Sequence, residues 1–96
     1  GDGRWAWDAT VIDWQGNEVT LIHGGDTLRL DRLVRRRDTG EWWVLDYKSA
    51  GRPEEQPALV EQLTRYREAV QTANPGATVR AAFLTGEGRV AEVVTD

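Results

Sequence analysis

The sequence predicts a single α/β domain with a mixed sheet, formed by an antiparallel meander, one crossover helix and two further strands. Three observations lead to this expectation. In the first half, short segments of alternating apolar and polar residues are separated by turn-forming residues, as is typical of strands. From Pro57 onward, apolar residues recur every three or four positions, which indicates an amphipathic helix at about Glu54 to Asn74. Two short segments rich in β-forming residues follow, so the predicted order is β-β-β-β-α-β-β.

Turn signals divide the first half into its strands. The turns are expected at Trp14-Gln15-Gly16-Asn17, at Gly24-Gly25-Asp26 and at Asp38-Thr39-Gly40. The predicted strands therefore cover residues 5–14, 18–23, 27–37 and 42–49. Adjacent strands joined by such short turns form a β-meander.

The second half begins with a loop that contains Pro53, and acidic residues follow it as suits the first turn of a helix. Asn74-Pro75-Gly76 ends the helix. Residues 78–84 and 89–95 form the last two strands, around a tight turn at Gly86-Glu87-Gly88. A right-handed crossover is expected if the strand 78–84 runs parallel to the strand 42–49.

The amino-acid composition limits which covalent cross-links, metal sites and binding partners are possible. The chain has 96 residues, no Cys and one His, so disulfides, thiolate metal sites and multi-histidine zinc sites are excluded. A metal would have to bind carboxylates, which favours Mg²⁺ or Mn²⁺. The net charge of −4 argues against a general DNA-coating protein but allows a local basic patch.

The location expected from the sequence is the cytoplasm. No apolar run approaches the roughly 18 residues of a membrane span, and the N-terminus lacks the pattern of a signal peptide. The chain contains no Met and starts at Gly-Asp-Gly. We therefore expect residues 1–96 to be one domain of a longer chain.

The strand 42–49 ends with a carboxylate and an amine two residues apart. Side chains alternate between faces along a strand, so Asp46 and Lys48 project to the same side. Lys48 is the only lysine among 12 basic residues. Its compact ammonium suits contact with a water, a metal-bound hydroxide or a phosphate oxygen better than a guanidinium would.

Hairpin geometry adds a second carboxylate to this pair. A two-residue loop at Asp38-Thr39 would place Asp31 directly opposite Asp46, and a loop at Thr39-Gly40 would place it opposite Lys48. Either register gathers the three groups on one face, with β-carbons roughly 5–8 Å apart. A register shifted by one residue would separate them. From spacing alone, the cluster is either a metal site or an ordinary group of surface ion pairs.

Three segments together resemble the RecB-type nuclease domain of the PD-(D/E)XK superfamily. They are Leu28-Arg29-Leu30-Asp31-Arg32-Leu33-Val34, Val44-Leu45-Asp46-Tyr47-Lys48-Ser49 and Gln62-Leu63-Thr64-Arg65-Tyr66. The resemblance extends from about residue 18 to residue 94. Such domains occur at the C-termini of AddA-like and UvrD/Rep-like helicase-nucleases.

The resemblance implies a restriction-endonuclease-like fold and a magnesium- or manganese-dependent DNA exonuclease that acts in recombination and repair. Asp31 and Asp46 resemble the metal-binding carboxylates, Lys48 resembles the catalytic lysine, and the Tyr47 carbonyl resembles a further metal ligand. Gln62 and Tyr66 match the Q-x-x-x-Y positions near DNA. The implied partners are DNA, the helicase portion of the parent chain and a second helicase-nuclease subunit, with no membrane.

Two features depart from the family. The family begins with a helix that carries an acidic or histidine metal ligand, but no helical pattern precedes Trp5. The Gly that commonly lies three residues before the first Asp is Leu28 here. His23 is a candidate substitute ligand, although a single His at a strand end is usually structural or solvated.

Other residues have two interpretations each. Arg35, Arg36 and Arg37 are either a solvated approach to a turn or, with further arginines nearby, contacts to DNA phosphates. The tryptophans are either packing residues or base-stacking surfaces, and Trp42-Trp43 would send one ring to each face of the sheet. The alternative to a nuclease is a non-catalytic DNA-binding or docking domain of a helicase, and a plain structural β-domain is a third interpretation.

Overall fold

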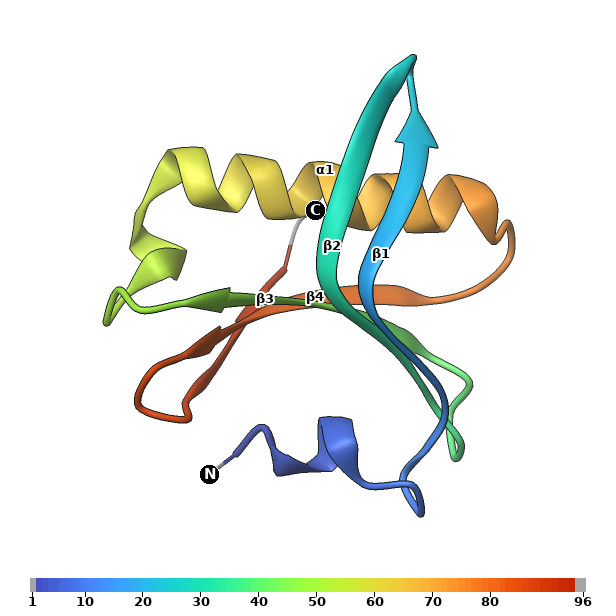
Figure 1. Cartoon of the computed structure of the whole chain (residues 1–96), viewed down its shortest axis with the longest axis horizontal. Helices are drawn as coiled ribbons and strands as arrows, with labels where there is room; N and C mark the ends of the chain where they lie inside the picture. The colour runs from blue at the N-terminus through green and yellow to red at the C-terminus, as the bar shows by residue number, and fades with distance from the viewer. Residues whose placement is uncertain (1, 95–96) are drawn as a thin grey trace.

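The computed structural model describes residues 2–94 and contains a five-stranded mixed sheet and one α-helix (Figure 1). The strands are ordered β1-β2-β3-β4-β5, and only β3 and β4 are parallel. The mixed α/β class predicted from the sequence is confirmed. In chain order the elements are η1 (Arg4–Trp7, 3₁₀), β1 (Ile12–His23), β2 (Asp26–Arg36), β3 (Trp42–Lys48), η2 (Pro53–Glu55, 3₁₀), α1 (Pro57–Ala73), β4 (Val79–Thr85) and β5 (Val90–Val93).

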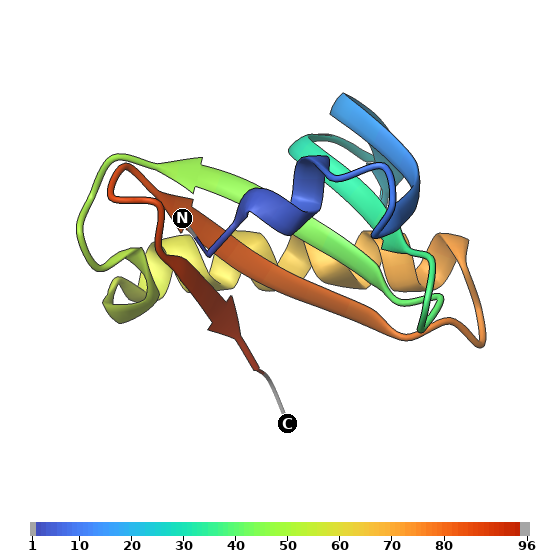
Figure 2. The ribbon, with the colours of Figure 1, turned by 90° about the horizontal axis from the view of Figure 1, so that it is seen from below.

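The sheet is covered on both faces (Figure 2). Helix α1 lies on one face, where its Leu63 and Val70 are buried against the strands. The short helix η1 lies on the opposite face, where its Ala6 is buried. We call these the α1 face and the η1 face. The α1 face buries Leu28, Leu30, Leu33, Val44, Val79, Ala81, Phe83, Ala91 and Val93, and the η1 face buries Ile12, Val34, Trp43, Leu45, Ala82 and Leu84.

The two neighbouring tryptophans at the start of β3 point to opposite faces, as predicted. Trp42 packs on the α1 face and Trp43 is buried on the η1 face. The same alternation directs Asp46 and Lys48 to the α1 side of the sheet and Tyr47 to the η1 side. Because both faces are covered, the apolar residues of β3 form a nearly continuous buried run.

The β1–β2 hairpin is long and strongly bent (Figure 1). Beyond the bend, Val19 and Leu21 pack on the α1 face, whereas Asn17 reaches a side chain on the η1 face. The faces exchange at Glu18, whose φ is +51°, a conformation that a non-glycine residue rarely adopts in a strand. The bend therefore brings the outer half of the hairpin over the helix.

The predicted first strand and first turn are wrong. Residues 4–7 form η1, which is not a strand of the sheet, and β1 runs without a break through the predicted turn at residues 14–17. Gly16 has no side chain, which lets the Trp14 and Val19 side chains pack closely against the backbone at this position. A Cβ on it would lie 3.0 Å from the Trp14 ring and 2.9 Å from a Val19 methyl group. Pairing with β2 over the whole hairpin outweighs the local turn preference of Gly-Asn.

The helical segment begins differently from the prediction. Pro53–Glu55 forms η2, and α1 starts only at Pro57, where a proline is tolerated because its missing N–H needs no partner. The helix ends at Ala73, and β4 then runs parallel to β3, so α1 is the crossover connection. The last predicted strand is confirmed as β5, although Thr95 lies outside the described residues.

Among the described residues, no helix has the length and apolar character needed to cross a membrane.

Candidate functional site

Asp31 and Asp46 meet where β2 and β3 separate. The last pair in their ladder is Arg32 with Leu45, which makes Asp31 and Asp46 the next opposed positions. This is the first of the two registers expected from the sequence. The loop that sets it spans residues 37–40 rather than two residues, and it closes with the Arg36 amide donating to the Glu41 carbonyl at 2.9 Å. Gly40, at φ +73°, completes this turn.

Asp31 is held by the backbone of the neighbouring strand. The Tyr47 amide donates a 2.9 Å hydrogen bond to Asp31 Oδ2. In a strand, the N–H and C=O of one residue point to the same side. The Tyr47 carbonyl therefore also points toward β2, on the side of Asp31.

Asp46 is a buried carboxylate, with only 5% of its surface exposed. Burial, together with the neighbouring Asp31 carboxylate, raises the pKa of Asp46 to about 6 even though Lys48 opposes both effects. Two carboxylates this close cannot both be ionised cheaply without a positive charge between or beside them. The site therefore has a deficit of positive charge near neutral pH.

Lys48 supplies part of that charge. Its Nζ lies 3.0 Å from Asp46 Oδ2, an ion pair on the α1 side of β3. The geometry is not that of a directed hydrogen bond, and Asp46 Oδ2 is a buried oxygen without a hydrogen-bond partner. A buried carboxylate oxygen normally has such a partner, so Oδ2 keeps lone pairs that can bind a cation.

These donors fit a hard divalent cation. Carboxylate and carbonyl oxygens are the ligands that Mg²⁺ and Mn²⁺ prefer, and Mg²⁺ commonly binds only one or two carboxylates and keeps several waters. Asp31, Asp46 and the Tyr47 carbonyl match that set. Within residues 2–94, no group of three or more His, Cys, Asp or Glu side chains comes together. Water or substrate oxygens would complete the coordination.

His23 does not complete this cluster. It pairs with Asp26 at the tip of the β1–β2 hairpin. Asp31 lies opposite the Glu18 position, five residues back along β1, which corresponds to roughly 17 Å of strand. Glu18 is nearer but forms an exposed ion pair with Arg29, 2.7 Å apart.

The predicted helical residues lie on α1. Gln62 is exposed on this helix, and Tyr66, one turn later, is half-buried against the core of the α1 face. This is the side of the sheet to which Asp46 and Lys48 project. The role of Gln62 and Tyr66 beside DNA stays a prediction.

The three consecutive arginines lie at the other end of β3. Arg35 pairs with Trp42, six residues before Lys48 and roughly 20 Å away along the strand. Arg35 binds Asp13 through two hydrogen bonds, and Arg36 binds Asp38. Arg37 donates to backbone carbonyls of residues 9 and 12. The fold thus does not bring them to the carboxylates, and contact with DNA there stays a prediction.

Sequence reasoning missed a buried arginine on the η1 side. Arg32 is 1% exposed, and its guanidinium donates to Ala6 O, Asn17 Oδ1 and Gln15 Oε1 at 2.6–3.1 Å. All three acceptors are neutral. Burial lowers the pKa of Arg32 accordingly. The visible signal is a cation inside the apolar run Leu30-Asp31-Arg32-Leu33-Val34.

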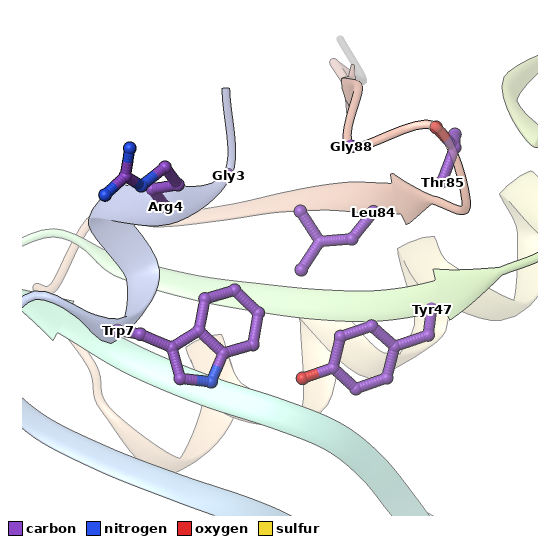
Figure 3. Close-up of a pocket in the computed structure, with 7 residues that line it drawn as sticks. All are labelled: Gly3, Arg4, Trp7, Tyr47, Leu84, Thr85 and Gly88. Carbon is purple, nitrogen blue, oxygen red and sulfur yellow. The ribbon is translucent and has the colours of Figure 1, made fainter. Parts of the chain in front are cut away.

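Sequence reasoning also missed a hollow on the η1 face (Figure 3). It has a volume of about 260 Å³ and lies between η1 and the carboxyl ends of β3 and β4. Trp7 and Tyr47 line it side by side, with ring centroids 6.2 Å apart and planes inclined by 23°. No alternation pattern could have found it, because Trp7 belongs to a 3₁₀ segment that was predicted as a strand.

No protein-family model matches the chain, and no curated protein matches it. A function is therefore inferred from its own residues.

Proposed function

We propose that this chain is a metal-dependent DNA nuclease module that hydrolyses phosphodiester bonds. One observation carries the proposal. The buried carboxylate of Asp46 lies beside Asp31, with the ammonium of Lys48 3.0 Å from its unbonded oxygen. A purely structural ion pair would not need a second carboxylate that raises the pKa of the first.

Each residue has a defined role in this proposal. Asp31 and Asp46 bind a divalent cation, and the Tyr47 amide fixes the orientation of Asp31 by its hydrogen bond. The cation, when bound, supplies a Lewis acid that lowers the pKa of water and offsets phosphate charge. Lys48 lies close enough to orient the attacking water or to stabilise negative charge on the phosphoryl oxygens.

The reaction is an in-line displacement at phosphorus. The water loses a proton to solvent as its oxygen forms a bond to phosphorus, the bond to the sugar oxygen breaks, and the leaving oxygen takes up a proton from solvent. Lys48 is the only lysine in the sequence and therefore the only side-chain ammonium that can act as a compact cationic point charge there.

The proposal also covers the topology of the fold and the biological role of the activity. A parallel β3–β4 pair joined by α1, next to an antiparallel hairpin, supports a restriction-endonuclease-like topology. The resemblance described above supports an exonuclease acting with a helicase portion of the parent chain in recombination and repair.

One observation favours a second candidate function, a DNA-binding or docking domain without catalysis. Only two acidic side chains converge on the site, and within residues 2–94 no third metal ligand of the His, Cys, Asp or Glu type joins them. In that case, Asp46 and Lys48 would be a remnant of a nuclease site.

A cleavage assay separates the two functions. Linear single-stranded and double-stranded DNA are incubated with the chain and Mg²⁺ or Mn²⁺, with chelator as the blank. Asp46→Asn and Lys48→Met should abolish cleavage, while Asp13→Asn, an exposed carboxylate paired with Arg35, should leave it unchanged. Cleavage that survives both site variants would contradict the proposal. Salt-sensitive DNA binding without any cleavage would support the second function instead.

A further inference from the structure

Two exposed, nearly parallel aromatic rings lie next to each other on the η1 side, and we call Trp7 and Tyr47 the aromatic platform. Trp7 is 49% exposed and Tyr47 is 45% exposed, values that are high for such large apolar side chains. Their planes differ by only 23°, so both rings turn a face in nearly the same direction (Figure 3). Leu84 lines the same hollow.

The inner side of this platform carries an uncompensated positive charge. The Arg32 guanidinium lies 4.6 Å from the centroid of the Trp7 ring. Because Arg32 is buried and Trp7 is half exposed, the guanidinium lies on the buried side of the ring. Its hydrogen-bond acceptors are all neutral, so no carboxylate among the described residues cancels this charge. Arg4 also lines the hollow.

The platform lies next to the proposed nuclease site. A second hollow of about 300 Å³ adjoins the first, because Tyr47, Leu84 and Thr85 line both. Lys48 also lines the second hollow. Since Tyr47 and Lys48 are consecutive, a ligand that crosses the carboxyl end of β3 can touch the ring on one face and the ammonium on the other. Ligands of open α/β sheets commonly bind at this edge.

We infer that the aromatic platform binds an unpaired nucleotide, with the base stacked on the open faces of Trp7 and Tyr47 and the phosphate directed toward Lys48. The identification of the ligand as DNA rests on the proposed function. An exposed aromatic surface over a buried cation suits a ligand that joins a π-face to a negative charge, and a nucleotide has both. A base inside a duplex has no free face, so the platform selects single strands or frayed ends.

Binding of an oligothymidylate in chelator at low salt tests this inference without any cleavage. The indole N–H signals of the five tryptophans are followed by NMR during the titration. The Trp7 signal should shift. The Trp14 signal should not, because Trp14 is similarly exposed at 43% but packs against Trp42 on the other face.

Variants and a modified ligand measure the contribution of stacking. Trp7→Ala should weaken binding about 5- to 150-fold, the range of one stacked base. Trp14→Ala is the matched control and should change affinity less than about 2-fold. Trp7→Phe keeps a ring over Arg32 and should recover most of the binding, which separates stacking from loss of folding. An abasic oligonucleotide with the same number of phosphates should bind the wild-type chain no more tightly than the oligothymidylate binds Trp7→Ala.

Equal affinity for the abasic and the thymidylate strands would overturn the inference, as would equal effects of Trp7→Ala and Trp14→Ala. Failure of the proposed function has a different signature. If the chain binds the oligonucleotide through Trp7 but never cleaves DNA, the proposed nuclease function is contradicted and nucleotide binding by the aromatic platform is supported. If the Trp7→Ala variant cleaves DNA with the same KM as the wild type, nucleotide binding by the aromatic platform is contradicted and the proposed nuclease function is supported.

Discussion

The backbone amide of Tyr47 donates a 2.9 Å hydrogen bond to Asp31 Oδ2, and this bond links β2 to β3 just beyond their ladder. It positions one carboxylate beside another that is buried. The strand pairing thus creates an electrostatic cost at Asp46, which Lys48 only partly offsets.

Asp46→Asn should stabilise the protein near neutral pH. The pKa of Asp46 is raised from 3.8 to about 6 in the folded state, so the folded chain holds this proton more tightly than the unfolded chain. The free energy of unfolding therefore falls as the pH rises from about 4 to about 6, by up to about 3 kcal/mol. Asn cannot ionise, so the variant should be about 1–3 kcal/mol more stable at pH 7 and gain nothing near pH 4.

Urea unfolding at several pH values measures this difference. Asp38→Asn is the control, since Arg36 lowers the pKa of Asp38 and this charge is stabilising. Asp38→Asn should not stabilise the protein at pH 7. If the wild type and Asp46→Asn have the same free energy of unfolding at every pH, the pKa of Asp46 is not raised by folding.

Lys48→Met should abolish cleavage and raise the pKa of Asp46 further. The ammonium is the group that lowers this pKa in the wild type. We expect a fall in kcat of about 100-fold or more, by analogy with the removal of one charge-stabilising group from an active site. Lys48→Arg keeps the charge but not the compact shape, and should recover the pKa while recovering little of the activity.

The carboxyl ¹³C signal of Asp46 reports the pKa, and DNA cleavage at saturating Mg²⁺ reports kcat. Full activity in Lys48→Met would remove Lys48 from the mechanism. An unchanged Asp46 titration would show that the 3.0 Å ion pair does not persist in solution.

Arg32→Met should loosen η1 from the sheet. Four hydrogen bonds from the guanidinium connect β2 to Ala6 and to β1. Hydrogen bonds to charged groups contribute about 1.5–3 kcal/mol, whereas relief of the buried charge acts in the opposite direction. The buried Ala6 carbonyl would lose its partner, so we expect a net loss of about 1–3 kcal/mol.

Arg29→Met is the matched control on the same strand. Arg29 is 66% exposed in its ion pair with Glu18, and its loss should cost less than about 1 kcal/mol. Urea unfolding gives both values, and near-ultraviolet circular dichroism reports the environment of Trp7. An Arg32→Met variant as stable as the wild type would mean that the cost of burying the charge equals the gain from its hydrogen bonds.

Most strands and the helix could be predicted from the sequence, because apolar periodicity reflects which face of an element is buried. The N-terminal region could not. Trp5 and Trp7 alternate like a strand, yet residues 4–7 form η1 over the sheet. Gly16-Asn17 has the composition of a turn, yet Gly16 is needed where the Trp14 ring approaches the backbone. Tertiary packing decides both cases, and local preference cannot report it.

The candidate site was predictable from the sequence, but its register was not. Residue spacing allowed Asp31 to lie opposite Asp46, opposite Lys48 or, in a register shifted by one residue, on the other face, and the four-residue loop that contains Gly40 selects the first. The depth of burial of Asp46 depends on packing above the sheet, which spacing does not encode. The positive charge behind Trp7 was hidden for the same reason, since Arg32 turns inward at a bend in the hairpin.

Metal binding at Asp31 and Asp46 tests the central claim most directly. Mn²⁺ is added to the chain, and paramagnetic broadening of the backbone amide signals is recorded by NMR. The account predicts that the signals of Asp31, Asp46 and Tyr47 broaden first, at or below about millimolar Mn²⁺, and that Mg²⁺ competes. The double variant Asp31→Asn/Asp46→Asn should lose this broadening. Unchanged signals at millimolar Mn²⁺, or the same broadening in the double variant, would contradict the claim that these carboxylates form a metal site.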